Sequence, residues 1–241
     1  MKILFSPSEA KRLTPNPQNS PKISIFCDRD EIIHSYFSAI KSGNLGELEQ
    51  IFGVKSGINE LREQILQPCY HKAVLMYDGV AYDALDYANL SSSATKYIDE
   101  NLLIFSNLYG VLRAGDYVQF YKLKQGKVVG QIDSAKYYKS RLQNALDEIL
   151  GSGDILDLRA GYYDKFYTIK RPFITMKFLK NGKVVSHYAK YYRGLILRHL
   201  ALCEVGDFGQ MMEIKFPNLS LLNITKSKLK SELVFEINDS C

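Results

Sequence analysis

The sequence predicts a single mixed α/β domain that spans residues 1–241, built from a mixed sheet with helices around it. Three observations favour this class. Apolar runs typical of strands alternate with segments of helical periodicity, and no change of composition separates two halves. No repeat of 20 to 50 residues is visible. With 46% hydrophobic and 24% charged residues, the chain is able to bury an ordinary globular core.

The net charge and the hydropathy pattern indicate which partners and which cell compartment to expect. The formal net charge is +5, which suits a partner that carries phosphate but falls short of a histone-like excess. No run reaches the roughly 18 apolar residues of a membrane helix, and the N-terminus lacks the pattern of a signal peptide. We therefore expect a soluble cytoplasmic protein with no membrane partner, and the oligomeric state stays open.

The cysteines and histidines show no spacing typical of a metal or redox site. Neither C-x-x-C nor H-x-x-x-H occurs among Cys27, Cys69, Cys203, Cys241, His34, His71, His187 and His199. We expect no metal and no cofactor. In a chain without an export signal, the thiols are expected to be reduced and mostly buried.

The first elements follow from short-range patterns. Residues 2–5 form a short apolar run that ends at Ser6-Pro7, which predicts a buried strand followed by a loop. Residues 14–21 contain three prolines and predict an exposed excursion. Residues 28–41 have the i, i+3, i+4, i+7 apolar spacing of an amphipathic helix, and Gly43 ends it.

The middle of the chain predicts two more strands and a helix. The apolar run 73–76 is interpreted as a strand, and 80–90 as a helix or a turn. The serines 91–93 supply an N-cap for a helix through about Asn101. Residues 102–105 fit either the end of that helix or a buried strand, and their short length favours the strand.

The second half contains the clearest periodicity. Residues 134–150 predict a long helix closed by Gly151, followed by a strand over 154–158.

A hairpin should come next. Residues 173–178 and 184–188 predict two strands joined at Asn181-Gly182, a pair that tolerates positive φ. A helix over 191–203 and a strand over 232–237 complete the prediction.

The loop after the first strand combines a hydroxyl, a carboxylate and a cation in Ser8, Glu9 and Lys11. Such a loop is suited to binding or processing a nucleotide. The alternative is a solvated turn with a capping serine.

Apolar residues on both sides of Gly110 resemble the hairpin of helix-hairpin-helix elements, whose backbone N–H groups contact a DNA phosphate. Arg113 and Asp116 follow, and Tyr121 and Lys122 lie just beyond. The alternative is a tight structural loop in which Arg113 and Asp116 pair.

Two further segments carry charge. Asp157, Arg159 and Gly161 follow a predicted strand and resemble, weakly, the first motif of nucleotide-binding folds, because only one glycine is present. Residues 165–203 contain nine lysines and arginines and neither Asp nor Glu, with aromatic residues between them. This segment predicts a basic face suited to phosphate pairing and base stacking, although a solvated surface over core aromatics is the alternative.

Five motifs, taken in order, resemble the YaaA family of peroxide-stress proteins over nearly the whole chain. They are Pro7-Ser8-Glu9-x-Lys11, Tyr82-Asp83-Ala84-Leu85, Ser106-x-Leu108-Tyr109-Gly110 with Arg113, Asp116 and Tyr121-x-Leu123, Asp157-Leu158-Arg159-x-x-x-Tyr163, and Ser186-His187-x-x-Lys190-x-x-x-Gly194-x-x-x-Arg198.

The resemblance implies a bacterial cytosolic protein of the peroxide response that is associated with protecting DNA and limiting free intracellular iron. It also implies a compact mixed α/β fold, a basic cleft, a helix-hairpin-helix-like element and binding to double-stranded or branched DNA. Two departures stand out. Ala114 occupies a position that is usually proline, and Glu9 places the chain in the Ser-Glu-x-Lys branch.

Three hypotheses follow. The first is a DNA-binding protein with phosphate contacts from Lys11, Gly110, Arg113, Tyr121, Lys122, Arg159, Lys165, His187, Lys190, Arg193 and Arg198. The second is an enzyme acting on a nucleotide or DNA base, with candidate catalytic residues Ser8, Glu9, Asp116, Asp157 and Lys190. The third, direct iron binding, lacks a recognisable ligand set. Convergence of Glu9, Asp116, Asp157 and Lys190 in one pocket would favour the enzyme, and dispersal would favour the binder.

Overall fold

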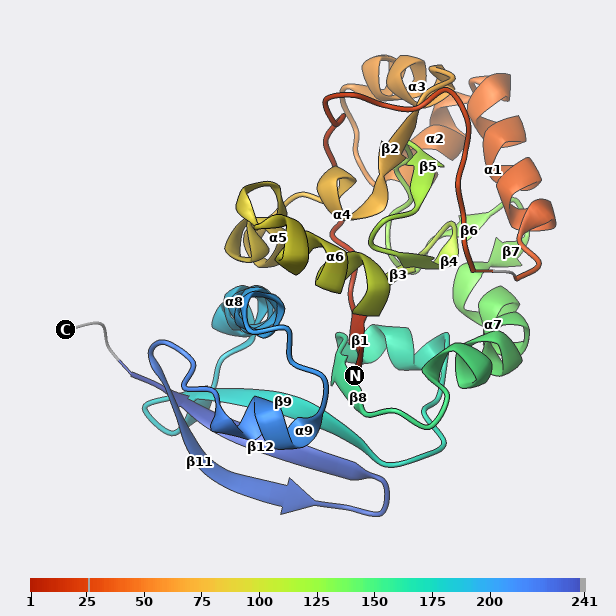
Figure 1. The fold of residues 1–241 in the computed structure, drawn as a ribbon. Coiled ribbons are helices and arrows are strands. Elements are labelled where there is room, and N and C mark those ends of the chain that lie inside the picture. Colours follow the sequence, from red (N-terminus) through yellow and green to blue (C-terminus); the bar gives the residue numbers. More distant parts are fainter. Residues whose placement is uncertain (26, 239–241) are drawn as a thin grey trace.

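A computed structural model describes residues 1–25 and 27–238. An eight-stranded mixed sheet runs through the molecule in the order β11-β12-β9-β8-β1-β3-β4, with β10 paired to β9 (Figure 1). Its strands are β1 (Lys2–Phe5), β3 (Leu102–Ser106), β4 (Gly110–Arg113), β8 (Ile155–Leu158), β9 (Phe173–Lys180), β10 (Lys183–Val184), β11 (Leu219–Lys226) and β12 (Lys230–Ile237). The mixed α/β prediction is confirmed.

The centre of the sheet is parallel and buried. Ile3 pairs with Leu102 of β3 on one side and with Leu156 of β8 on the other, and both pairings are parallel. Continuous apolar runs favour such strands because both faces are covered. Since β1, β3 and β8 run in the same direction, the loops that follow them meet at one edge of the sheet, which is where open α/β folds bind ligands.

Helices cover this sheet, and smaller units surround it. The α-helices are α1 (Asp30–Ser42), α2 (Leu45–Phe52), α3 (Ile58–Leu66), α4 (Ala73–Met76), α5 (Val80–Leu85), α6 (Ser92–Asn101), α7 (Ser134–Leu150), α8 (Ser186–Leu202) and α9 (Phe208–Glu213), and the 3-10 turns are η1 (Tyr87–Asn89) and η2 (Gly161–Lys165). Two small sheets pair β2 (Tyr70–Lys72) with β5 (Tyr117–Gln119) and β6 (Val128–Val129) with β7 (Ile132–Asp133). The predicted helices at α1, α6 and α7 are confirmed, as is the strand reading of 102–105.

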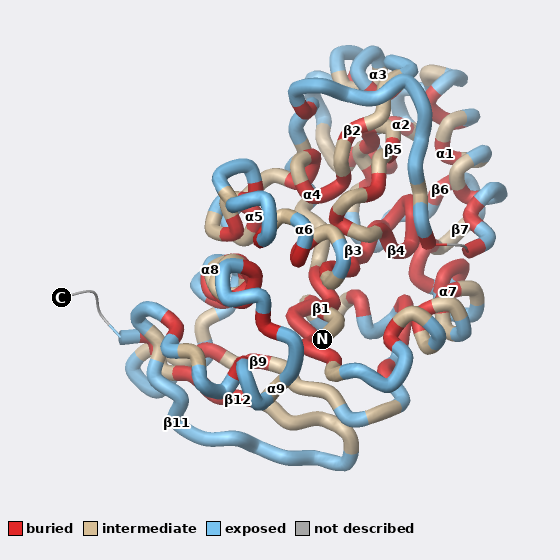
Figure 2. The backbone as a smooth tube through the Cα atoms, in the orientation of Figure 1, coloured by how far each residue is buried: buried red, intermediate tan, exposed pale blue. Residues whose placement is uncertain are grey.

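The outer strands are covered on one side only. The helices α8 and α9 lie on one face of the β9 and β12 end of the sheet, and in Figure 1 none of the described elements covers the opposite face of these strands. Residues of the edge strand β11 are mostly exposed (Figure 2). The protein core therefore lies around β1, β3 and β8, and the hairpin β11–β12 extends from it.

Two predicted elements are wrong. Residues 73–76 form the helical turn α4 instead of a strand, because four consecutive apolar residues, three of them buried, carry no period that separates the two states. The predicted strand 184–188 ends at Val184, and α8 begins at Ser186 instead of Tyr191. The turn itself is confirmed, since Asn181 and Gly182 have φ of 51° and 72°.

The helix-hairpin-helix prediction is also wrong at the level of secondary structure. Residues 107–109 join the antiparallel strands β3 and β4, so Gly110 begins a strand of a β-hairpin.

Among the three described cysteines, Cys27 is buried, Cys69 is partly exposed and Cys203 is exposed. All three are free thiols, but the prediction that they are mostly buried fails, and Cys241 lies outside the described residues.

Candidate functional site

A cavity of about 840 Å³ lies between the end of β8, the first half of β9, the start of α8 and the β11–β12 turn. It lies beside the edge where the parallel strands end, as the strand-end argument predicts. Six cations and three carboxylates line it: Arg159, Lys177, Lys190, Arg193, Lys228 and Lys230 against Asp157, Asp164 and Glu232. The pairing of these charges decides what the cavity is able to bind.

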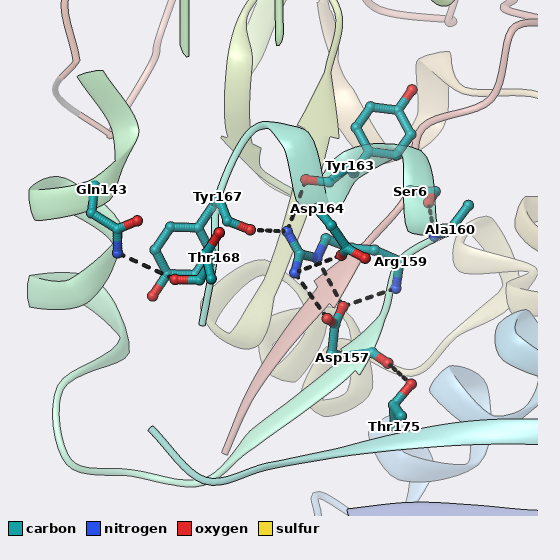
Figure 3. Close-up of polar contacts among 10 residues, drawn as sticks. All are labelled: Ser6, Gln143, Asp157, Arg159, Ala160, Tyr163, Asp164, Tyr167, Thr168 and Thr175. Atoms are coloured by element: carbon teal, nitrogen blue, oxygen red, sulfur yellow. Dashed lines mark hydrogen bonds and ion pairs between the residues drawn. The ribbon is translucent and has the colours of Figure 1, made fainter. Parts of the chain in front are cut away.

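On the β8 wall of the cavity, formed by Asp157, Arg159 and Asp164, every charged side chain has a partner. Arg159 donates from Nε and Nη2 to the two oxygens of Asp157 at 2.8 and 2.9 Å (Figure 3). Its Nη1 donates to the carbonyls of Tyr163 and Tyr167 at 3.1 and 3.0 Å, and Asp164 lies 3.4 Å from Nη2. Both members of the bidentate pair are buried, and no donor nitrogen of Arg159 is left over. Asp157 and Arg159 therefore hold the loop after β8 in place.

On the α8 wall, which Lys190 and Arg193 form, the charged side chains have no partner among the described residues. Arg193 lines the same cavity, yet no hydrogen bond or ion pair from its side chain to any described residue is formed, and its Nε is buried without a partner. Burial lowers the pKa of the guanidinium, and the nearby Asp157 carboxylate opposes that shift. A guanidinium stripped of water needs acceptors, and an anion in the cavity would supply them.

Three lysines join Arg193 around the cavity. Lys177 of β9, Lys190 of α8 and Lys228 of the β11–β12 turn also form no side-chain hydrogen bond or ion pair within the described part of the chain. Lys230, in contrast, is bound to Glu232 at 3.1 Å. The sequence interpretation ended its basic segment at residue 203 and missed Lys228, although the alternation Lys226, Lys228, Lys230 was a usable signal.

The loop after β1 builds a second, separate cluster. Lys11 donates to the Ser8 carbonyl at 3.1 Å, and its Nζ lies 4.3 Å from the centre of the Tyr121 ring. Lys122 donates to the Glu9 carbonyl at 3.0 Å, which ties the loop to the segment after β5. The Tyr121 hydroxyl is buried in bonds to Tyr77 and Ser106. Tyr121 is thus a core residue.

The Gly110 region contributes to the fold and lies apart from the cavity lining. Gly110 is buried with φ of 76°, and a Cβ there would lie 2.6 Å from the Tyr138 ring. Asp116 accepts from the Arg113 backbone N–H at 2.9 Å and from the Ser24 hydroxyl at 2.6 Å. The alternative of a tight loop is therefore the better description, although Asp116 binds the Arg113 backbone and not its guanidinium. That guanidinium donates to the Glu100 carbonyl at 3.2 Å.

The remaining predicted residues are dispersed. Arg198 donates to the carbonyls of Leu85 and Asp86 at 3.0 Å and thereby caps α5. A Cβ at Gly194 would lie 1.9 Å from the Ala81 carbonyl oxygen, so this glycine admits the backbone of α5. Lys165 lies over the Tyr162 ring. The side chain of His187 lies outside what the structure describes.

Of the four residues whose convergence in one pocket would favour an enzyme, only Asp157 and Lys190 line the cavity. Glu9 and Asp116 lie elsewhere, and the Asp157 carboxylate is occupied by Arg159.

Over the described residues, no group of three or more His, Cys, Asp or Glu side chains is arranged to hold a metal ion. None of the described helices is long and apolar enough to cross a membrane.

Comparison with known proteins assigns the family. The model described as peroxide stress protein YaaA matches residues 1–223. The chain belongs to the YaaA family of peroxide stress proteins. The family match thus includes both the Lys11 cluster and α8, and it ends within β11.

Relatives from other bacteria match most of the chain or nearly all of it. A protein of Campylobacter jejuni that is named as uncharacterised is 44% identical over 99% of this chain and 100% of its own length. A UPF0246 protein of Streptomyces coelicolor is 28% identical over 83% of this chain and 82% of its own. A UPF0246 protein of Fusobacterium nucleatum is 26% identical over 92% and 93%.

Proposed function

We propose that this member of a peroxide-stress family is a cytoplasmic protein that binds DNA through the phosphate backbone, with the cavity beside α8 as the contact surface. The observation that carries the proposal is the unpaired side chain of Arg193, whose Nε is buried without an acceptor. Lys190 of the same helix, Lys177 of β9 and Lys228 of the β11–β12 turn surround it. Cations held on separate elements suit a polyanion, because each is able to meet a different phosphate.

Exposed rings next to these cations favour nucleic acid over a simple anion. Tyr188 and Tyr191 of α8 keep 45% and 43% of their surface exposed, and Lys190 lies between them in sequence. Aromatic faces stack on unpaired bases. Branched DNA, which offers unpaired bases beside duplex phosphates, is therefore the expected preferred ligand.

The test is a titration of labelled duplex and branched DNA at several salt concentrations. We expect affinity to fall steeply with salt and Arg193→Met to weaken binding about tenfold, which is the loss of one charge-assisted contact. Lys139→Ala is the matched control, because Lys139 is exposed on α7 and does not line the cavity. Binding that is indifferent to salt, or equal in both variants, contradicts the proposal.

We propose that the same protein also limits free iron in the cell. It predicts a larger pool of chelatable iron in a deletion strain challenged with peroxide, measured by electron paramagnetic resonance after loading with an iron chelator. An unchanged pool removes this part of the proposal and leaves DNA binding untouched.

A further inference from the structure

Lys11 is held in an environment that phosphate binding does not require. Its Nζ lies between two tyrosine rings, 4.3 Å from the centre of Tyr121 and 5.3 Å from the centre of Tyr77. Its one hydrogen bond within the described residues goes to the Ser8 carbonyl, and no carboxylate lies within ion-pair distance. Burial of the amine and the neighbouring cation Lys122 lower the Lys11 pKa to about 7, and Glu9 opposes this weakly. Near neutral pH the amine is thus partly uncharged.

A chain of hydroxyl groups ends at the same place. Ser106 Oγ accepts from the backbone N–H groups of Leu108 and Tyr109 at 3.3 and 2.9 Å, so its own hydrogen points to the Tyr121 oxygen at 2.8 Å. Tyr121 then donates to Tyr77 at 2.9 Å. The Tyr77 hydroxyl is left as the end of the chain with a proton to donate. An amine that is partly uncharged near neutral pH thus lies 5.3 Å from the centre of the ring that carries this proton donor.

We propose that Lys11 is a nucleophilic amine that forms an imine with a small carbonyl compound. The Nζ lone pair attacks the carbonyl carbon, and the carbonyl oxygen takes a proton to give a carbinolamine. Nitrogen loses a proton, the hydroxyl leaves as water after a second protonation, and the nitrogen then gives up its remaining proton, so that a neutral carbon–nitrogen double bond remains. One amine and one carbonyl compound give one imine and one water, and no oxidant or reductant is consumed. Desolvation and a nearby cation are the two means by which proteins activate a lysine for this step.

This inference does not depend on DNA binding, because none of the cavity-lining cations takes part in it. The test uses acetaldehyde as the probe and sodium cyanoborohydride to reduce the imine, with peptide mass spectrometry of the full chain to measure N-ethylation at each lysine. We expect Lys11 to be modified at pH 7 about tenfold faster than the exposed Lys22, because an ordinary lysine is almost fully protonated there. The rate at Lys11 should reach half its maximum near pH 7.

Three variants separate a built site from chance reactivity. Lys122→Gln removes the neighbouring cation and should move the half-maximum of the Lys11 profile to higher pH, whereas Lys127→Gln, an exposed lysine of the same segment, should not. Tyr77→Phe keeps the ring and removes the terminal hydroxyl, so the rate of trapping should fall with an unchanged profile. The proposal is overturned if Lys11 in the native protein is not modified, or if its rate at pH 7 is no higher than the rate at Lys22.

Discussion

Two walls of one cavity carry similar charges and use them in opposite ways. On the β8 wall, Arg159 is bound to Asp157 and to two carbonyls, and every donor nitrogen is used. On the α8 wall, Arg193 and Lys190 have no side-chain partner in the described parts of the chain. A cation in a basic segment therefore indicates a binding site only where the fold leaves it unpaired.

The largest effect is expected on the paired wall. Arg159→Leu leaves the buried Asp157 carboxylate without its partner and should lower the free energy of unfolding by about 3–5 kcal/mol. Arg193→Leu removes a desolvated cation that has no partner among the described residues, so it should not lower that free energy and should raise it by about 1 kcal/mol. Urea unfolding followed by circular dichroism measures both. Equal losses in the two variants would abolish the contrast between the walls.

The attachment of the α8 wall to α5 depends on Gly194. Gly194→Ala places a Cβ 1.9 Å from the Ala81 carbonyl oxygen, so the helices must separate. We expect a loss of about 2–3 kcal/mol of stability together with weaker DNA binding, because the binding wall moves. The control is Gly46→Ala in α2, where the nearest atom would lie at 3.6 Å, and it should stabilise the protein slightly. Wild-type stability of Gly194→Ala would show that the helices have room to adjust.

The Lys11 loop treats its cation in a third way. Burial reduces the charge of the amine, whereas the β8 wall pairs its cation and the α8 wall leaves its cations unpaired. Because the folded-state pKa is lowered from 10.5 to about 7, the unfolded chain binds more protons between these values. Stability should therefore rise with pH across this window, by at most about 1.4 kcal/mol per pH unit. Comparing urea unfolding of the wild type and Lys11→Met at pH 7, 8 and 9 cancels the other titrating groups. Parallel pH dependences would show that the amine is charged in the folded protein.

The smallest effect is expected at Lys190, which is exposed at the mouth of the unpaired wall. Lys190→Ala should weaken DNA binding by about 1 kcal/mol, or fivefold, and lower the salt dependence by about one phosphate contact. Lys190→Arg should retain most of the affinity, since an exposed phosphate contact accepts either cation. If arginine is as damaging as alanine, Lys190 acts in an enclosed substrate site and the enzyme alternative gains support.

Patterns along the sequence were enough to predict most of the local elements and the family. Long periodic segments such as 134–150, and the Asn181-Gly182 turn, are specified by residues that are neighbours in the chain, so patterns along the sequence identify them. The five ordered motifs identified the family for the same reason. Where a segment was short, as at 73–76, burial alone left the helix and the strand equally compatible.

Which charged residues hold the fold and which are left for a ligand depends on contacts that form only when the chain folds. Arg198 and Arg193 belong to one basic run, but the first meets the carbonyls at the end of α5 and the second meets none. Lys228, 25 residues beyond that run, joins Arg193 because the β11–β12 turn reaches the cavity. Pairing and desolvation depend on contacts between residues far apart in sequence, and composition does not encode those contacts.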